Sequence, residues 1–222
     1  MKKILIFLAF LSAVQALFAD KIHFSASRMT GRAGDVSSRT ELTGNAQVKT
    51  SVLEIQSDSI ELYGKEFRFI KASGKVSGKN LETNMTFNCD ELEYDRDTKI
   101  ATLRGNVSLV DVDNAVTAQA QVIEYDQNAE TAVLQIQINL TQKDNICSGS
   151  YAIYYKKRQV LEISGNAQVK QDDDVFRAQH ITLDMETQDI TLGGNVKGSI
   201  IDKEEPEPEK STDTLEDGPE ND

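Results

Sequence analysis

Histidine and cysteine, two side chains that often carry out catalysis or bind zinc, are few in this chain. The 222 residues include two histidines, His23 and His180, and two cysteines, Cys89 and Cys147. No zinc spacing or nucleophile motif is present, and residues 74–79 have the composition of a phosphate-binding loop without its spacing. The sequence therefore predicts a protein that is not an enzyme and that uses no cofactor and no metal.

The two cysteines raise the question of a disulfide bond. Cys89 and Cys147 fall in the third and fifth of the repeats described below, four strand passes apart, which is roughly 19 Å at about 4.8 Å per strand. A disulfide needs Cα atoms within about 7 Å of each other. We therefore expect no bridge, and at position 89 a small buried side chain.

A unit of about thirty residues repeats six times and supplies the elements of the fold. The six residues 44–49, Gly-Asn-Ala-Gln-Val-Lys, recur letter for letter at 165–170. Weaker copies begin at Gly74, Gly105 and Gly194. In the remaining copy, Ile136 occupies the position of the glycine. These positions step by 30, 31, 31, 29 and 29 residues. Such a regular period indicates stacked supersecondary units.

Within a unit, apolar residues alternate with polar ones, as they do in half-buried strands. Phe87 and Cys89 share one phase, but the next inward pair begins at Leu92, so the phase slips by one residue. A bulge or corner produces this slip, and Gly105 marks the matching corner on the return strand. Each unit is a long bent hairpin. Six units predict an all-β fold, a bent antiparallel sheet of about twelve bent strands that is open at both ends.

The continuous apolar face of this sheet is the candidate ligand site. Its interpretation is open between a filled core and a groove for acyl chains, because ligand grooves are mostly apolar with a polar rim. Small residues at the corners favour the groove, namely Ala26, Ser57, Cys89, Ala120, Ser150 and Ala178. The predicted lining consists of Phe24, Met29, Ile60, Leu62, Phe87, Leu92, Tyr94, Leu103, Val107, Leu109, Ile123, Tyr125, Ile153, Tyr155, Phe176, Ile181 and Leu183.

The two ends of the stack are predicted to be unpaired strands, near residues 22–28 and 195–201. Open sheet edges aggregate, are blocked or accept a further strand. End-to-end assembly by strand addition, including a homo-oligomer, is therefore the predicted mode of partnership. Nucleic acid is not an expected partner, because the formal net charge is −12 and phosphate binding needs a basic surface.

The termini differ from the repeats in composition. Residues 1–19 have two lysines, an apolar stretch and a small residue before position 20, which predicts a secretory signal peptide cleaved before Asp20. An uncleaved anchor is the alternative. Residues 202–222 are acidic, include all three prolines and predict a disordered tail. Residues 20–201 then form one β domain outside the cytoplasmic membrane.

The repeated pattern Ala-Asp-x-Leu-x-Tyr-Asp followed by Gly-Asn-Val, seen best from Cys89 to Val107, resembles the periplasmic bridge component of lipopolysaccharide export. This is the OstA-like family, which shares the N-terminal domain of the organic-solvent-tolerance protein. The resemblance covers residues 22–200. It implies a bent antiparallel β-jellyroll whose groove holds the acyl chains of a glycolipid, and end-to-end stacking between inner-membrane and outer-membrane components. Ile136, Cys89 and the acidic tail depart from the pattern.

The sequence thus predicts a periplasmic protein that carries lipopolysaccharide or a similar glycolipid from the inner to the outer membrane. Two alternatives remain. One is a self-assembling structural or adhesive scaffold with a filled core, and the other is a membrane-anchored sister module of the same transport system.

Overall fold

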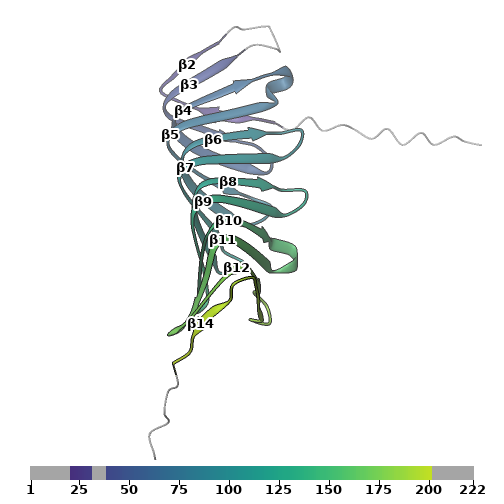
Figure 1. Cartoon of the computed structure of the whole chain (residues 1–222). Coiled ribbons are helices and arrows are strands. Elements are labelled where there is room, and N and C mark those ends of the chain that lie inside the picture. The colour runs from purple at the N-terminus through teal and green to yellow at the C-terminus, as the bar shows by residue number, and fades with distance from the viewer. Residues whose placement is uncertain (1–20, 32–38, 202–222) are drawn as a thin grey trace, which may run out of the picture.

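The computed structural model describes residues 21–31 and 39–201 (Figure 1). Regular structure in these residues is almost entirely β-strand, with two short 3-10 turns, η1 (Lys65–Phe67) and η2 (Lys156–Arg158). The predicted signal peptide, residues 1–19, and the predicted tail, residues 202–222, lie outside the described residues. Within the described ranges, no helix has the length and apolar character needed to cross a membrane.

Ten long strands make up most of the sheet, and four short strands complete its two ends. The long strands are β3 (Thr40–Lys49), β4 (Leu53–Tyr63), β5 (Phe69–Asn80), β6 (Met85–Asp95), β7 (Ile100–Asp111), β8 (Val116–Asp126), β9 (Thr131–Gln142), β10 (Asn145–Tyr155), β11 (Val160–Gln171) and β12 (Asp174–Asp184). The short strands are β1 (His23–Ser25), β2 (Arg28–Thr30), β13 (Ile190–Gly193) and β14 (Lys197–Ser199).

Strand order in the sheet follows the sequence, and every pairing is antiparallel. β1 and β2 both pair with β3, and β13 and β14 both pair with β12. Each short pair is therefore one bent strand interrupted at its corner. Counted in this way the described residues form twelve bent strands, which confirms the all-β prediction and its open ends.

The corners lie at the predicted glycines. At Gly105 and Asn106 the backbone has φ values of 73° and 45°, and the pairing of β7 with β8 shifts between Arg104 and Val107. Two residues on β7 there oppose one on β8, which is a bulge. Glycine adopts positive φ without steric cost. The same two-residue positive φ recurs at the corresponding position in five other places: 44–45, 74–75, 136–137, 165–166 and 194–195.

Bending at the corners folds the sheet into two facing layers (Figure 1). We call the layer whose hairpins span residues 63–69, 95–100, 126–131, 155–160 and 184–190 the first limb. The second limb has its hairpins at residues 49–53, 80–85, 111–116, 142–145 and 171–174. The side opposite the corners, where the hairpins of the two limbs meet, is called the seam. The apolar core lies between the limbs.

Candidate functional site

Most of the predicted lining residues point into the space between the limbs. Leu92 and Leu103, for example, are paired neighbours on β6 and β7, and both are buried. Alternation of apolar and polar residues places one face of every strand inward. The residues confirmed as buried are Ile60, Leu62, Phe87, Leu92, Tyr94, Leu103, Val107, Leu109, Ile123, Tyr125, Ile181 and Leu183.

The predicted inward orientation of Ile153 and Tyr155 is wrong by one residue. In the segment 151–155, Ala152 and Tyr154 are the buried residues, and Ile153 and Tyr155 are only half-buried. The segment from Tyr151 to Tyr155 is apolar in both registers, so its own pattern does not define a face. The neighbouring strands set which face is inward, because Ala152 pairs with the buried Leu134 and Ile163. For the same reason the corner equivalent to Cys89 is Gly149 rather than Ser150.

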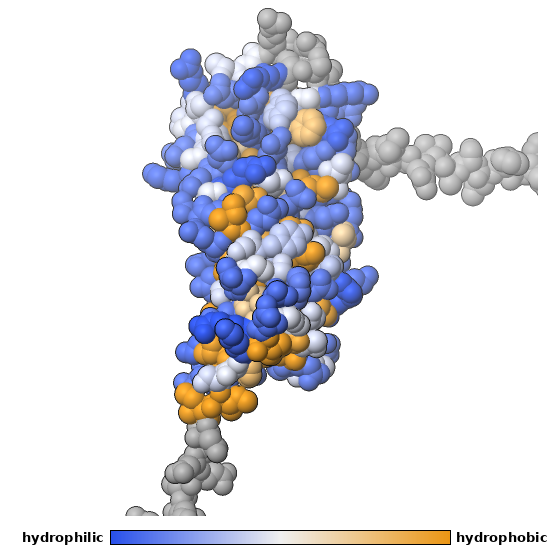
Figure 2. Space-filling model, in the orientation of Figure 1, coloured by the Kyte–Doolittle hydropathy of each residue, from blue (hydrophilic) through white to orange (hydrophobic). Residues whose placement is uncertain are grey.

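Three predicted lining residues lie at the ends of the sheet and remain accessible. Phe24 is 45% exposed and Met29 is 54% exposed, since both are on the short edge strands β1 and β2. Phe176 on β12 is half-buried next to β14. Figure 2 shows apolar residues gathered at this end of the molecule, where Val196, Ile200 and Ile201 are exposed.

Several inward residues are absent from the predicted lining. Most lie on the strands that carry the corner position, and Ile55 and Met85 lie on the landmark strands β4 and β6. The same period-two alternation identifies them in the sequence. The missed residues include Leu42, Val48, Ile55, Ile70, Met85, Leu134, Leu140, Leu161 and Ile163, which are all buried.

Both cysteines are free and buried, as expected for Cys89 from the strand separation. Burial raises the pKa of the Cys89 thiol and that of the Cys147 thiol to about 12. Because the thiolate is the reactive form, both side chains act as small apolar residues of the core.

A cavity of about 920 Å³ opens between the limbs at the N-terminal end of the sheet. We call it the mouth. Its volume is at the upper end of the range for small-molecule sites. The apolar part of its lining is Ile22, Phe24, Val52, Leu62, Phe67 and Tyr94, and its charged rim is Lys65, Glu66, Arg68, Glu82, Arg96, Asp97 and Lys99.

Contacts on the rim hold the hairpins of the first limb together. Arg68 donates two hydrogen bonds to the Asp95 carboxylate, from Nε at 2.9 Å and from Nη2 at 2.5 Å. This guanidinium holds the pKa of Asp95 well below its usual range. Arg96 Nη1 donates to the carbonyl oxygens of Glu66 and Phe67 at 2.9 and 3.1 Å. The rim therefore has a fixed framework, with charges of both signs facing solvent.

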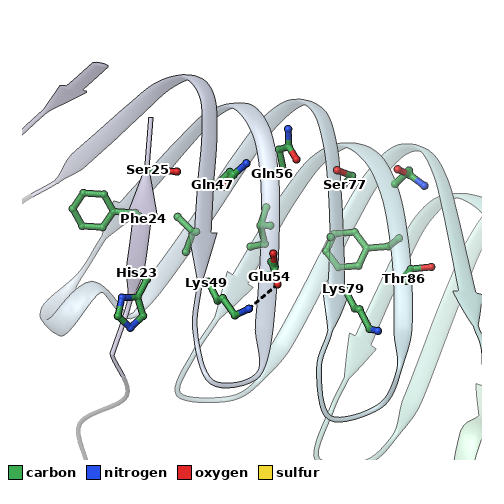
Figure 3. Close-up of a pocket in the computed structure, with 15 residues that line it drawn as sticks. His23, Phe24, Ser25, Gln47, Lys49, Glu54, Gln56, Ser77, Lys79 and Thr86 are labelled. Carbon is green, nitrogen blue, oxygen red and sulfur yellow. Dashed lines mark hydrogen bonds and ion pairs between the residues drawn. The ribbon is translucent and has the colours of Figure 1, made fainter. Parts of the chain in front are cut away.

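A second hollow, of about 640 Å³, runs along β1, β3, β4, β5 and β6 in the second limb (Figure 3). Exposed polar side chains such as His23, Lys49 and Glu54 line much of it, and Lys49 pairs with Glu54 at 3.1 Å. Acyl chains need continuous apolar surface. The mouth has the larger volume and the larger apolar lining, and it opens between the limbs, so we take the mouth and the apolar interior behind it as the candidate site.

The interior behind the mouth is closely packed. The cavity beside Leu103, Leu109 and Tyr125 has a volume of only about 30 Å³. Further along the seam, Asp111 is completely buried and bonded to the opposite limb, where Tyr154 Oη donates to Asp111 Oδ2 at 3.0 Å and Lys156 Nζ contacts Oδ1 at 2.6 Å. Burial beside this carboxylate raises the pKa of Tyr154. The candidate site is therefore open at the mouth and closely packed behind it.

Comparison with known proteins gives a family but no curated relative. No curated protein matches the chain. Among solved structures, the chain is similar to the crystal structure of LptH from Pseudomonas aeruginosa, described as the LptA homologous periplasmic component of the lipopolysaccharide transport device. The identity is 10% and the TM-score 0.26, over 82% of this chain and 96% of that one. A TM-score of this size supports no argument on its own.

The family assignment comes from the sequence profile instead. The model of the LptA/(LptD N-terminal domain) LPS transport proteins matches residues 26–160 and 86–189. Together the two matches cover well over half of the chain, including the repeats from the second strand to β12. Six corner bulges in register within one antiparallel sheet agree with the match. The chain therefore belongs to the LptA/(LptD N-terminal domain) family of LPS transport proteins.

Proposed function

We propose that this protein is a periplasmic bridge component of lipopolysaccharide transport. It binds the acyl portion of lipopolysaccharide or a similar glycolipid between its limbs and relays it from the inner to the outer membrane. The observation that carries the proposal is the mouth, a cavity of about 920 Å³ with apolar lining residues and a charged rim, at one end of the sheet of a chain that belongs to this family.

The chemistry of the mouth suits a lipid with a polar head. Phe24 and Phe67 supply accessible apolar surface on which an acyl chain leaves water, worth about 0.8 kcal/mol for each buried methylene group. Rim cations such as Lys65 and Lys99 lie within reach of an anionic head group. No bond is made or broken in such a relay, so no catalytic residue is required.

The proposed partners are the inner-membrane and outer-membrane components of the transport system and further copies of this chain. The ends of the sheet support this, because β1, β2, β13 and β14 are short and leave edge backbone groups for strand addition. Val196, Ile200 and Ile201 add exposed apolar surface at the C-terminal end. Nucleic acid is not a proposed partner.

One observation favours a second candidate function, a self-assembling scaffold with a filled core. Behind the mouth the interior leaves a cavity of only about 30 Å³. A membrane-anchored sister module is the other alternative, and its discriminating segment lies outside the described residues. Sequencing the mature N-terminus separates it, because cleavage before Asp20 leaves no anchor.

Native mass spectrometry of the protein purified from its own periplasm, followed by lipid extraction, tests the proposed function. A stoichiometric glycolipid that co-purifies with the protein is the expected result and identifies the cargo. A lipid-free protein that also fails to take up an added acylated probe would contradict the proposal and favour the scaffold.

A variant pair locates the binding surface. Phe67→Asp places a charge in the half-buried lining of the mouth and should abolish capture of the probe while the fold survives. Val112→Asp is the matched control, since Val112 is 52% exposed on a hairpin of the second limb away from the mouth. Equal capture by the two variants would remove the mouth from the site.

A further inference from the structure

Polar contacts cross the seam between hairpins of opposite limbs, and three groups of them lie at or behind the mouth. We call them clasps. Gln127 Nε2 donates to Glu82 Oε2 in the first, Asp111 bonds Tyr154 and Lys156 in the second, and Gln142 and Asn145 bond Met185 and Gln188 in the third. On the second limb the clasps begin at residues 82, 111 and 142, which is the spacing of the repeat.

The second clasp is the most deeply buried. Besides the bonds from Tyr154 and Lys156, the Asp111 carboxylate accepts a hydrogen bond from Asn114 Nδ2 on its own hairpin at 2.7 Å. On the other limb, Gln159 Nε2 donates to the Lys156 carbonyl at 2.7 Å and to Tyr154 Oη at 3.3 Å. Hydrogen bonds within each limb therefore position the polar groups of that limb, and these groups bond to each other across the seam.

The third clasp contains only neutral groups. Asn145 Nδ2 donates to Gln188 Oε1 at 2.5 Å, and Gln142 Nε2 donates to the Met185 carbonyl at 3.2 Å. Asn145 Oδ1 is buried and has no hydrogen-bond partner within the described residues. An unsatisfied buried oxygen weakens the closed state, because that oxygen regains hydrogen bonds when water reaches it.

Closed clasps leave no room for a lipid. The mouth has a volume of about 920 Å³, whereas the separate cavity beside Leu103 has only about 30 Å³, room for about one or two water molecules. An acyl chain can pass the mouth only if the limbs move apart. Separating the limbs breaks the clasps, since these join the limbs at the seam.

The chemistry of the clasps makes opening reversible. Asp111 and Lys156 gain water when they separate, and the net worth of a buried ion pair is small because solvation replaces the lost attraction. Limbs joined by large apolar side chains at the same places would expose new apolar surface on opening. Polar clasps therefore keep the empty groove closed and still allow it to open.

We propose that the three clasps gate the groove, holding the limbs closed when it is empty and opening in sequence as an acyl chain advances from the mouth. This inference rests on the proposed function. It assigns to Glu82, Asp111 and Asn145 and to their partners a role in passage of the lipid, separate from the apolar lining that binds it.

Covalent locking of the first clasp tests the gate. In Glu82→Cys/Gln127→Cys, a short reagent with two thiol-reactive groups joins the limbs beside the mouth. Asn84→Cys/Asp113→Cys is the matched control, because Asn84 Nδ2 donates to Asp113 Oδ1 at 2.8 Å between neighbouring hairpins of the same limb. Cys89 and Cys147 are buried and should not react.

The probe is a photoreactive fatty acid, and mass spectrometry maps the peptides that it labels. We expect wild type and the control to be labelled both at the mouth, near Leu62, and in the interior, near Leu134. The locked protein should be labelled at the mouth only. Interior labelling that survives locking, or wild type labelled at the mouth alone, would overturn the gate and leave the proposed function standing. Absence of any labelling in wild type would contradict the proposed function itself.

A weakened clasp gives an independent measurement without cross-linking. Glu82 is exposed, so Glu82→Ala should fold normally and should raise the rate of interior labelling about threefold, the effect of losing one modest hydrogen bond. Asn84→Ala, on the same hairpin but bonded within its own limb, should leave the rate unchanged. An equal rate in wild type and Glu82→Ala would count against the first clasp as a gate.

Discussion

The N-terminal and C-terminal parts of the sheet are built from the same repeat, yet one is open and the other is closed. At the mouth, contacts such as Arg68 with Asp95 and Arg96 with the carbonyl of Glu66 stay within the first limb, and Glu82 on the rim bonds Gln127 across the seam. Further along, the corresponding hairpins bond across the seam, as Asp111 does with Lys156. Apolar alternation therefore builds two facing layers everywhere, and the hairpin side chains decide where the layers are joined.

The largest expected difference between the two parts lies in their tolerance of a charge. Leu103→Asp buries a carboxylate in the packed interior without a partner and should prevent folding, whereas Phe67→Asp at the half-buried mouth should leave a folded protein. Circular dichroism and urea denaturation measure both. A folded, stable Leu103→Asp protein would show that the interior is not closed.

Removing one member of the second clasp should destabilise the protein more than removing one member of an exposed ion pair, because the remaining charge stays buried. Asp111→Ala leaves Lys156 buried and unpaired, and should lower the free energy of unfolding by about 3 kcal/mol. Adding Lys156→Met to this variant should recover much of the loss, because it removes the unpaired charge. Urea midpoints of the single and double variants test this, and a single variant as stable as wild type would show that the clasp does not join the limbs.

The fourth corner offers a smaller gain in stability. Ile136 has φ 66° and is 54% exposed, whereas five equivalent positions have glycine at φ between 73° and 79°. A β-branched residue at positive φ is strained, so Ile136→Gly should raise the free energy of unfolding by about 1 kcal/mol. Gly105→Ile at an equivalent corner is the reciprocal variant and should destabilise the protein. Loss of stability in Ile136→Gly would mean that the side chain has a contact that offsets the strain.

The smallest expected effect concerns the framework of the mouth. Because Arg68 lowers the pKa of Asp95, the pair stabilises the fold above the unfolded-state pKa of about 4, and the contribution fades as the pH falls below it. Arg68→Ala should therefore lower the urea midpoint at pH 7, with a difference from wild type that shrinks below pH 4. An NMR titration should show the pKa of Asp95 rising in the variant. A pH-independent difference would assign the effect to packing of Arg68 over Phe69 instead.

Prediction from the sequence was correct where the residues of a single strand are enough to define its inward face and its corner. The corner glycines, the phase slip after Cys89 and the inward positions of Leu92 and Leu103 all follow from local spacing. It was wrong at Ile153 and Tyr155, because this segment is apolar on both faces and the pairing of Ala152 with Leu134 and Ile163 sets which face is inward. The groove was predicted as one uniform surface. Its division into a mouth and a clasped interior was not predicted, because the clasp partners are 43 to 45 residues apart in sequence.

The sequence by itself determined an all-β sheet of bent hairpins, the positions of its corners and its family, because period-two alternation and a repeat of about thirty residues are local properties of the chain. The tertiary structure alone decided which hairpins meet across the seam, how much space remains between the limbs and where the lipid site opens. These depend on how far the bent sheet closes on itself, which is set by contacts between side chains that no local pattern brings together.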